Sequence, residues 1–216
     1  MKLAKGSKSW IITTLIFSIM FLAIGIFFNN YTQSYVAILV SILLLLLCIF
    51  FIMFFRDPER TTGKGIVAAA DGKIREISEI DDSEVGKSIM ISTFMNVNNV
   101  HVNRACYNGK VISVDHKPGA HLPAFKKESE RNERVIIILD TSIGKIKIIQ
   151  IAGTLARRIV PYIKKGDKIN KGDRIGIIRL GSRVDVYISK KVVKKINVKI
   201  KDKILAGSDC LAEIND

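Results

Sequence analysis

The sequence predicts a β-dominated (α+β) protein in which one soluble domain follows a two-helix transmembrane hairpin. Three observations lead to this prediction. The chain opens with two long apolar runs that contain no charged residue, and many short runs rich in Val and Ile follow them, often with alternating polarity. Gly, Asp and Asn close most of the short runs, as expected for strands joined by tight turns. At 216 residues the chain has room for one such domain and an anchor.

The predicted anchor occupies residues 1–55, with spans at about 10–28 and 35–55. At ~1.5 Å per residue each span covers about 30 Å, which is the thickness of the hydrocarbon core. The connection "NNYTQS" is short and uncharged, so the spans form a hairpin. Lysines precede the first span and arginines follow the second, which places both ends in the cytoplasm. We therefore expect an anchor in the cell membrane, with the following domain on its cytoplasmic side.

Residues 56–216 are predicted to form the soluble domain. Runs such as "RVIIILD", "KIKIIQIAG" and "RVDVYIS" have the β-branched content of strands. One short helix is expected in "GTLARRIVPYI", from Thr154 to the residue before Pro161, because proline ends helices. A long loop is expected over Lys117–Arg134, where no periodicity is visible.

A weak internal repeat refines the predicted architecture. Residues 167–178, "DKINKGDRIGII", are echoed by residues 202–214, "DKILAGSDCLAEI". Together with "GIVAAADGKIREI", these segments resemble the hammerhead hairpins of barrel-sandwich domains of the lipoyl and biotinyl type. The motif around a carrier lysine is absent from the sequence. The repeat therefore predicts barrel-sandwich hairpins and no carrier function.

Composition restricts the classes of partner. Three cysteines, Cys48, Cys106 and Cys210, lie far apart without a CxxC pair, which predicts neither a disulfide framework nor a zinc site. The formal net charge of +14 suits nucleic acid or an anionic membrane surface equally well. The apolar spans favour the membrane, and no nucleic-acid-binding motif is present. We expect membrane lipid as a partner, and no nucleic acid or metal.

Three polar residues could act together. The strand pattern of "IIRLGSRVDVYIS" is broken at Gly181-Ser182, His101 lies in the alternating run "NNVHVNRA", and Asp71 precedes a glycine in "AAADGKI". Each has an ordinary structural reading as a bulge, a hydrogen-bonded histidine or a turn. Together, Ser182, His101 and Asp71 could form a nucleophile, base and acid relay. A membrane-anchored serine hydrolase that uses these three residues is one alternative. The sequence gives it no further support, because residue 184 is Val and the GxSxG elbow is therefore absent.

Several motifs occur in an order that resembles a known family. They are "FFRDPER" (54–60), "ADGKI", "NVHVNR", "ERNER", "QIAGTLARRIV" and "KKGDKINKGDRIGIIRLGSRVD", and they span most of residues 54–189. The chain is similar to the phosphatidylserine decarboxylase proenzymes, most of all to their short branch, in which a membrane hairpin precedes a compact β domain. Many members have Thr after the serine of the cleavage motif, whereas Arg183 follows it here, as in the short branch.

The resemblance implies that the chain cuts itself between Gly181 and Ser182. Ser182 would attack the carbonyl of Gly181, and a pyruvoyl group would form at the new N-terminus of residues 182–216. His101 would act as the base and Asp71 would orient it. The implied mature protein is a heterodimer of its own two chains. Its cofactor is the pyruvoyl group, with no metal and no pyridoxal phosphate.

The implied reaction is pyruvoyl-dependent decarboxylation of a serine phospholipid headgroup to the ethanolamine phospholipid, through a Schiff base. The substrate is phosphatidylserine or its ether-linked counterpart archaetidylserine, and an Ile- and Lys-rich composition hints at the latter. Candidate partners for the phosphate are Arg104, Arg157 and Arg158. His116 and His121 lie outside the motifs and are expected in loops or on the surface. A non-catalytic barrel-sandwich adaptor is a second alternative, and both alternatives leave the chain uncut.

Overall fold

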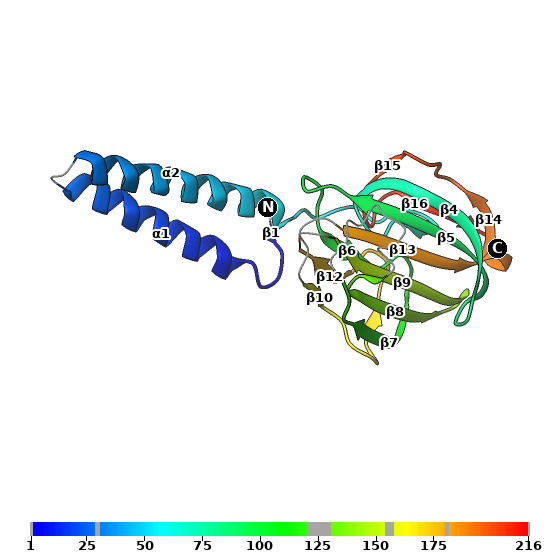
Figure 1. Cartoon of the computed structure of the whole chain (residues 1–216). Helices are drawn as coiled ribbons and strands as arrows, with labels where there is room; N and C mark the ends of the chain where they lie inside the picture. Colours follow the sequence, from blue (N-terminus) through cyan, green and yellow to red (C-terminus); the bar gives the residue numbers. More distant parts are fainter. Residues whose placement is uncertain (1, 29–30, 121–130, 154–157, 180–181, 216) are drawn as a thin grey trace. The chain divides into compact units, whose positions relative to one another are not determined.

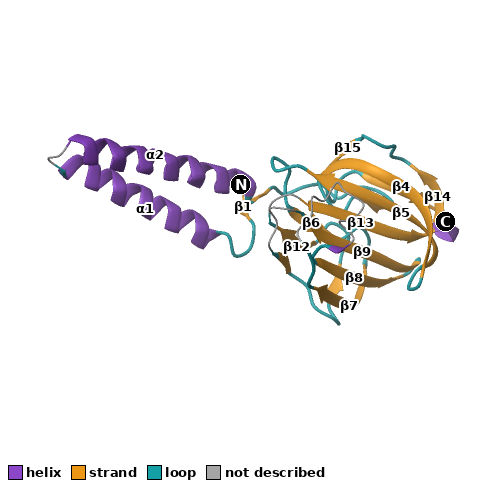
Figure 2. Ribbon diagram, in the orientation of Figure 1, coloured by secondary structure: helices purple, strands orange, loops and turns teal. Residues whose placement is uncertain are grey.

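The computed structural model describes residues 2–28, 31–120, 131–153, 158–179 and 182–215. The chain divides into two compact units, Met1–Pro58 and Glu59–Asp216. Strands hold 44% of the described residues and helices 24%. The predicted β-dominated class, with two apolar helices at the N-terminus, is therefore confirmed (Figure 2).

The first unit is a pair of helices, α1 (Lys8–Phe27) and α2 (Tyr31–Phe54), each long and apolar enough to cross a membrane. Small residues line their contact. Ser18 Oγ donates to the Ser41 carbonyl at 2.9 Å, and Ser41 Oγ donates to the Ser18 carbonyl at 2.8 Å. A Cβ on Gly25 would lie 2.7 Å from Ile38 Cγ1, so glycine permits the close approach. Strand β1 (Lys2–Leu3) pairs with β2 (Arg56–Asp57).

The second unit is built on a curled antiparallel sheet of eight strands (Figure 1). Strand β13 (Ser182–Ser189) lies inside this sheet, with a neighbour paired to each edge. The strands in spatial order are β11 (Lys168–Ile169), β7 (Gly109–Lys117), β8 (Arg134–Thr141), β9 (Gly144–Ala152), β13, β5 (Gly86–Met95), β4 (Gly72–Asp82) and β15 (Lys203–Ile204).

Two three-stranded sheets complete the unit. One has the order β10 (Ile159–Pro161), β12 (Arg174–Ile178) and β6 (Val102–Arg104), and the other has β14 (Val193–Ile196), β16 (Cys210–Ile214) and β3 (Ile66–Val67). A 3-10 turn at Lys190–Val192 follows β13. Alternate residues of β13, namely Val184, Val186 and Ile188, enter one apolar core with residues from both small sheets. The alternating pattern of the sequence thus places one face of the large sheet in the core.

The sequence repeat corresponds to two strand–turn–strand segments with similar turn hydrogen bonds. We call them hairpins, although the two strands of each lie in different sheets and pair with other strands. In the first hairpin, β11–β12, the Asn170 N–H donates to Asp173 Oδ2 at 2.7 Å. In the second hairpin, β15–β16, the Leu205 N–H donates to Asp209 Oδ2 at 2.8 Å. The turns contain Gly172 at φ +89° and Gly207 at φ +78°, a region that favours glycine.

The two hairpins also meet the large sheet in the same way. Lys168 of the first hairpin pairs directly with Lys110 of β7, and Lys203 of the second pairs directly with Lys73 of β4. The two halves of the sheet therefore repeat one local pattern, with one lysine pair in each half.

Two expectations need correction or comment. The predicted short helix does not reach Pro161, because Ile159–Pro161 form β10, in which the β-branched Ile159 and Val160 pair with β12. The first part of that helix, residues 154–157, lies outside the described residues. Most of the expected loop, residues 121–130, also lies outside them, and β7 and β8 bound it at Lys117 and Arg134.

Candidate active site

Ser182 is the first residue of β13 and is wholly buried. It lies between Met95, the last residue of β5, and Ala152, the last residue of β9. Two neighbouring strands thus end where β13 begins. Gly181, the predicted partner in cleavage, lies outside the described residues.

Ser182 belongs to a buried polar cluster, which we define as Ser182, Met95, Asn103 and Gln150. These four residues have no exposed surface, and neither does His101, which lies two residues before Asn103. Ser182 Oγ donates to Met95 Sδ at 3.2 Å, and Asn103 Nδ2 approaches the same sulfur at 3.6 Å. Gln150 Nε2 donates to Asn103 Oδ1 at 2.7 Å.

One acceptor of this cluster, Gln150 Oε1, has no hydrogen-bond partner within the described part of the chain. Buried polar atoms without partners are costly and uncommon away from functional sites. The side chain fits only because residue 176 is glycine, since a Cβ there would lie 3.0 Å from Gln150 Nε2. The cluster is therefore a candidate site.

His101 immediately precedes β6, and its backbone carbonyl accepts the Ile178 N–H of β12 at 3.3 Å. Its Nδ1 lies 2.9 Å from the Asn99 carbonyl oxygen. A carbonyl can only accept, so Nδ1 carries the proton, and in the neutral ring Nε2 is the basic nitrogen. The turn after β5 thus gives His101 the tautomer that a general base needs.

Asp71 has different partners from those expected. Its two carboxylate oxygens accept hydrogen bonds from the two terminal nitrogens of Arg60, and the Nη2–Oδ2 distance is 2.8 Å. Oδ1 also accepts a hydrogen bond from the Ala206 N–H at 2.8 Å. In the other half of the sheet, Asn108 Oδ1 accepts the Lys171 N–H at 2.7 Å in the equivalent position. Asp71 therefore has two contacts of different kinds. An asparagine could also accept the backbone N–H, as Asn108 does, but it could not form the ion pair with Arg60. The orientation of His101 by Asp71 stays a prediction.

The arginines expected at the phosphate are in varied settings. Arg104 is 4% exposed and donates to the Gly172 carbonyl at 3.0 Å. Its Cδ would lie 2.8 Å from a Cβ on Gly207, so it packs between the two hairpins. Arg158 is exposed, and Arg157 lies outside the described residues. Binding of the phosphate by these arginines stays a prediction.

One of the two remaining histidines is described. His116 is exposed, as expected, and its Nε2 lies 2.9 Å from Glu133 Oε1, outside the buried polar cluster. His121 lies outside the described residues.

The face of β13 opposite the core carries a buried ion pair. Arg183 donates to Asp185 Oδ2 from Nε at 3.1 Å and from Nη2 at 2.8 Å. Burial raises the pKa of Asp185, and the positive charge of Arg183 acts in the opposite direction. Asp185 Oδ1 has no hydrogen-bond partner among the described residues.

Arg183 belongs to a row of directly paired residues that crosses the large sheet at the end where Ser182 lies, and most residues of this row are basic. Directly paired residues share a face, so Arg183 shares its face with Phe94 and Ile151. The row runs across seven strands and contains Lys203, Lys73, Phe94, Arg183, Ile151, Arg134 and Lys117. Five of its seven residues are basic, which makes this end of the sheet attractive to anions.

Cys106 is a poor alternative nucleophile. Cys106 is completely buried, and burial raises the pKa of its thiol to about 12. A thiol with this pKa stays protonated at neutral pH and is unreactive.

Two residues of the cluster, Asn103 and Gln150, were not predicted as site residues. Both lie within the family motifs, in "NVHVNR" and "QIAGTLARRIV". The available signal was a polar residue at an inward position of an apolar strand, since Gln150 alternates with the buried Ile148 and Ala152.

Comparison with known proteins gives a consistent result. The sequence model of the family Phosphatidylserine decarboxylase matches residues 47–212. A phosphatidylserine decarboxylase proenzyme of Streptomyces avermitilis is 41% identical over 207 residues, which cover 95% of this chain and 91% of that protein. A protein of Methanococcoides burtonii with the provisional name archaetidylserine decarboxylase proenzyme is 41% identical over 98% of this chain and 96% of its own. A protein of Methanosarcina barkeri with the same provisional name is 40% identical over 98% of both.

The predicted resemblance is thereby confirmed over nearly the whole chain. The chain belongs to the phosphatidylserine decarboxylase family and is a carboxy-lyase of phospholipid metabolism.

Proposed function

We propose that this protein removes carbon dioxide from the serine headgroup of a membrane phospholipid, and that it becomes active by cutting itself between Gly181 and Ser182. The observation that carries the proposal is the wholly buried Ser182 hydroxyl at the start of β13, within a buried polar cluster whose Asn103 follows the equally buried His101 by two residues. The names of the relatives, which are serine phospholipid decarboxylase proenzymes, support the same reaction.

The proposed cut begins with attack of Ser182 Oγ on the carbonyl carbon of Gly181. His101 Nε2 takes the hydroxyl proton, the peptide C–N bond breaks, and the freed nitrogen takes up a proton, which leaves an ester. Loss of the Ser182 Cα proton then expels the Gly181 carboxylate. Water replaces the nitrogen, which leaves as ammonia, so that residue 182 becomes a pyruvoyl group.

The residues around position 182 fit such a group. A pyruvoyl group supplies a ketone that can condense with the headgroup amine and accept the electrons released as carbon dioxide leaves. Gln150 Oε1 is a buried acceptor that can hold an N–H of that amine. His101 Nε2 can hold the proton that the headgroup carbon takes up after carbon dioxide has left.

The lipid backbone is proposed to be either ester- or ether-linked, since relatives of both names align along nearly all of the chain. The two apolar helices are proposed to anchor the protein in the cell membrane, because most of their large apolar side chains are exposed. The positive-inside pattern supports a catalytic domain, residues 56–216, on the cytoplasmic side.

Two structural details belong to the same proposal. The equivalent hydrogen bonds of the two hairpins support a barrel-sandwich architecture. The pairing of β13 with both β5 and β9 supports a mature heterodimer in which residues 182–216 stay bound to residues 1–181.

Mass spectrometry of the purified protein tests the proposal. We expect two chains, residues 1–181 and 182–216, with the second lighter than its encoded mass by one ammonia. Borohydride reduction in the presence of a serine phospholipid should attach the amine to the shorter chain. Ser182→Ala should give one intact, inactive chain. An intact wild-type chain would contradict the proposal and favour the hydrolase or the adaptor.

A further inference from the structure

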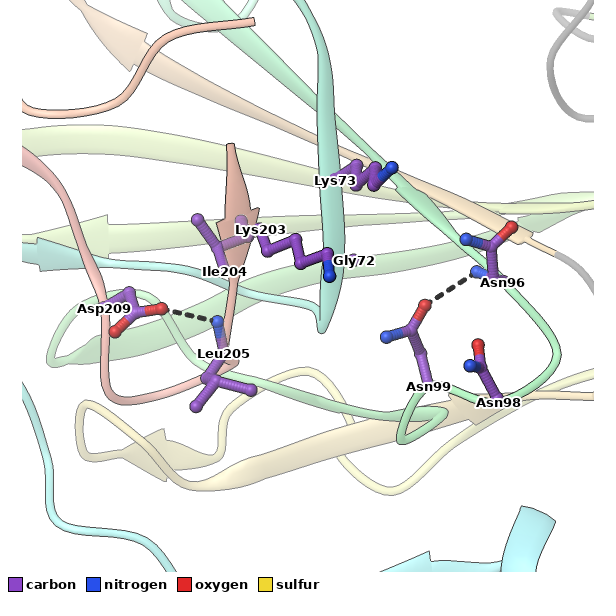
Figure 3. A pocket seen from close by; sticks show the side chains of 9 residues that line it. All are labelled: Gly72, Lys73, Asn96, Asn98, Asn99, Lys203, Ile204, Leu205 and Asp209. Carbon is purple, nitrogen blue, oxygen red and sulfur yellow. Dashed lines mark hydrogen bonds between the residues drawn. The ribbon is translucent and has the colours of Figure 1, made fainter. Parts of the chain in front are cut away.

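A cavity of about 590 Å³ lies between the start of β4, the turn after β5 and β15 (Figure 3). Its size is within the range of small-ligand sites. The polar residues of its lining are Lys73, Lys203, Asn96, Asn98, Asn99 and Asp209.

The turn that lines the cavity, residues 96–99, is connected along the chain to the buried polar cluster and to His101. Asn96 directly follows Met95, which pairs with Ser182. The Asn99 carbonyl oxygen lies 2.9 Å from His101 Nδ1. A ligand in the cavity would therefore contact the turn that orients the proposed base.

Two lysines line this cavity from neighbouring strands. Lys203 of β15 and Lys73 of β4 are directly opposite in the register, and among the described residues neither side-chain ammonium group has a hydrogen bond or an ion pair. Asp209 accepts the Leu205 N–H at 2.8 Å, which commits one of its carboxylate oxygens to the hairpin. Like charges directly opposite each other destabilise a sheet, and an anion between them would remove the repulsion.

The asparagine turn adds donors to the same space. Asn99 Oδ1 accepts the Asn96 N–H at 2.8 Å, so the orientation of this side-chain amide is fixed and its NH2 group is left for another partner. In Figure 3 the side chains of Asn96 and Asn99 lie across the cavity from β15, from which Lys203 extends toward Gly72. A Cβ on Gly72 would lie 2.1 Å from the Phe94 carbonyl oxygen, so only glycine fits at this position.

We propose that this cavity binds the phosphodiester of the serine phospholipid headgroup, with Lys73 and Lys203 as its counter-charges. The inference rests on the proposed function. The headgroup carries two anionic groups, and the carboxylate must lose its charge as carbon dioxide leaves. A cation at the carboxylate would stabilise the ground state, whereas a cation at the phosphate, which stays charged, holds the substrate without opposing the reaction. The lysines therefore suit the phosphate.

The second lysine pair of the sheet provides a matched control. Lys110 and Lys168 occupy the equivalent positions in the other half, but they line neither this cavity nor the smaller one near Glu79. Replacing them removes the same charge from the same fold. An effect seen only when Lys73 and Lys203 are replaced would thus show that the cavity binds the substrate, and would exclude a general attraction of the positive charge to lipid.

The test compares Lys73→Met, Lys203→Met and the double variant with Lys110→Met/Lys168→Met, in the full chain in detergent micelles. We expect normal self-cleavage in all of them. Each cavity variant should raise KM for a short-chain serine phospholipid about tenfold, with a smaller change in kcat, and the double variant should raise it further. Capture of free serine by borohydride, which involves no phosphate, should be unchanged in every variant.

Binding measurements separate the sources of phosphate. Glycerophosphoserine should inhibit the wild type competitively and lose this effect in the cavity variants. Inhibition by inorganic phosphate at similar concentrations would define a general phosphate site, whereas weak inhibition would assign the site to the diester. Equal changes in cavity and control variants, or no change in the cavity variants, would overturn the inference and leave the decarboxylase proposal intact.

Failure of the decarboxylase proposal can be distinguished from failure of the phosphate site. If the wild type converts no serine phospholipid, that proposal fails. Broadening of the phosphorus NMR signal of glycerophosphoserine still decides whether the cavity binds it. Broadening that disappears in the cavity variants alone would support the site, and equal signals in all variants would refute it.

Discussion

At the scale of single residues, the proposed site depends on one hydroxyl and one imidazole, both buried. Ser182 and His101 are wholly buried, and the Asn99 carbonyl at 2.9 Å fixes the proton of His101 on Nδ1. A weak nucleophile such as a serine hydroxyl needs a base, and Nε2 is the nitrogen without a proton in this tautomer. The contact with Asn99 thus defines which atom of His101 would act in the proposed reaction.

His101→Ala should leave most of the protein uncut, because the Ser182 hydroxyl loses its base. We expect the rate of self-cleavage to fall at least about 100-fold, as is typical for loss of a general base. The measurement is the fraction of intact chain over time by mass spectrometry. His116→Ala is the matched control and should be cut normally, since His116 is exposed and contacts Glu133. Normal cleavage of His101→Ala would exclude His101 from maturation.

Asp71 can be assigned to one of two roles by a double variant. Asp71→Asn should keep the bond from the Ala206 N–H, as Asn108 does in the other half, but should leave Arg60, whose side chain is 11% exposed, without its ion pair. We expect a loss of about 1–3 kcal/mol in the free energy of unfolding and slower cleavage. Cleavage should slow less than in His101→Ala.

Removing Arg60 as well distinguishes the roles. If Asp71 serves only to pair with Arg60, Arg60→Met/Asp71→Asn should regain both stability and cleavage. If Asp71 also acts on His101, stability should return while cleavage stays slow. Thermal unfolding and intact mass, measured on the same samples, give the two readouts.

The sequence suggested candidate residues for the site but not their contacts. Motif order pointed to Ser182, His101 and Asp71, whose role in the site stays a prediction. The contact of Asp71 with Ala206 joins segments 135 residues apart, and the lysine pair of the cavity depends on the register of β4 with β15. Register follows from packing of the whole sheet, so the sequence alone could not supply it.

At the scale of elements, β13 combines two environments on its two faces. One face carries Ser182 and enters the apolar core, and the other carries the buried pair of Arg183 and Asp185. The β-branched runs predicted the strands well, whereas the expected helix before Pro161 was wrong at its end. There the pairing of Ile159 with Ile178 prevailed over the weak local helix signal.

Arg183→Met, made in Ser182→Ala so that the chain stays intact, should lower the free energy of unfolding by about 3–5 kcal/mol. The reason is that the Asp185 carboxylate, 1% exposed, would lose its cation. Thermal unfolding in detergent at several pH values measures the change.

The pH dependence has a definite sign. Burial raises the pKa of Asp185, and loss of Arg183 should raise it further. A carboxyl with a raised pKa in the folded state favours folding when protonated. The variant should therefore lose stability as the pH rises from about 4 through the raised pKa. Arg183→Met/Asp185→Asn should regain stability and lose this dependence. A pH-independent loss in the single variant would contradict the explanation.

At the scale of the whole molecule, the two units have separate interiors. The apolar core of the second unit is formed by residues between Ile66 and Ile214, none of which belongs to the helices. Glu59 and Arg60 are held within that unit by Arg174 at 3.0 Å and by Asp71. The second unit thus begins just after Pro58.

Deleting residues 1–58 should leave a domain that folds and cuts itself, because the removed residues supply no group of the buried polar cluster. Turnover of lipid in bilayers should fall strongly, while turnover in detergent micelles should fall less, since the anchor supplies location. Deleting residues 1–60 is the control, because it also removes Arg60 and should destabilise the domain. Equal losses in bilayers and micelles would show that the helices contribute to the site.

The position of β13 inside the large sheet also affects the kinetic stability of the cleaved protein. A cut immediately before this strand would turn one chain into two that are joined by ladders on both edges of β13. Unfolding would then release two molecules, and recovery would require them to meet again. The group made from Ser182 could not be made a second time, so damage by heat would be permanent. The working lifetime would be set by how slowly the sheet opens and not by the folding equilibrium.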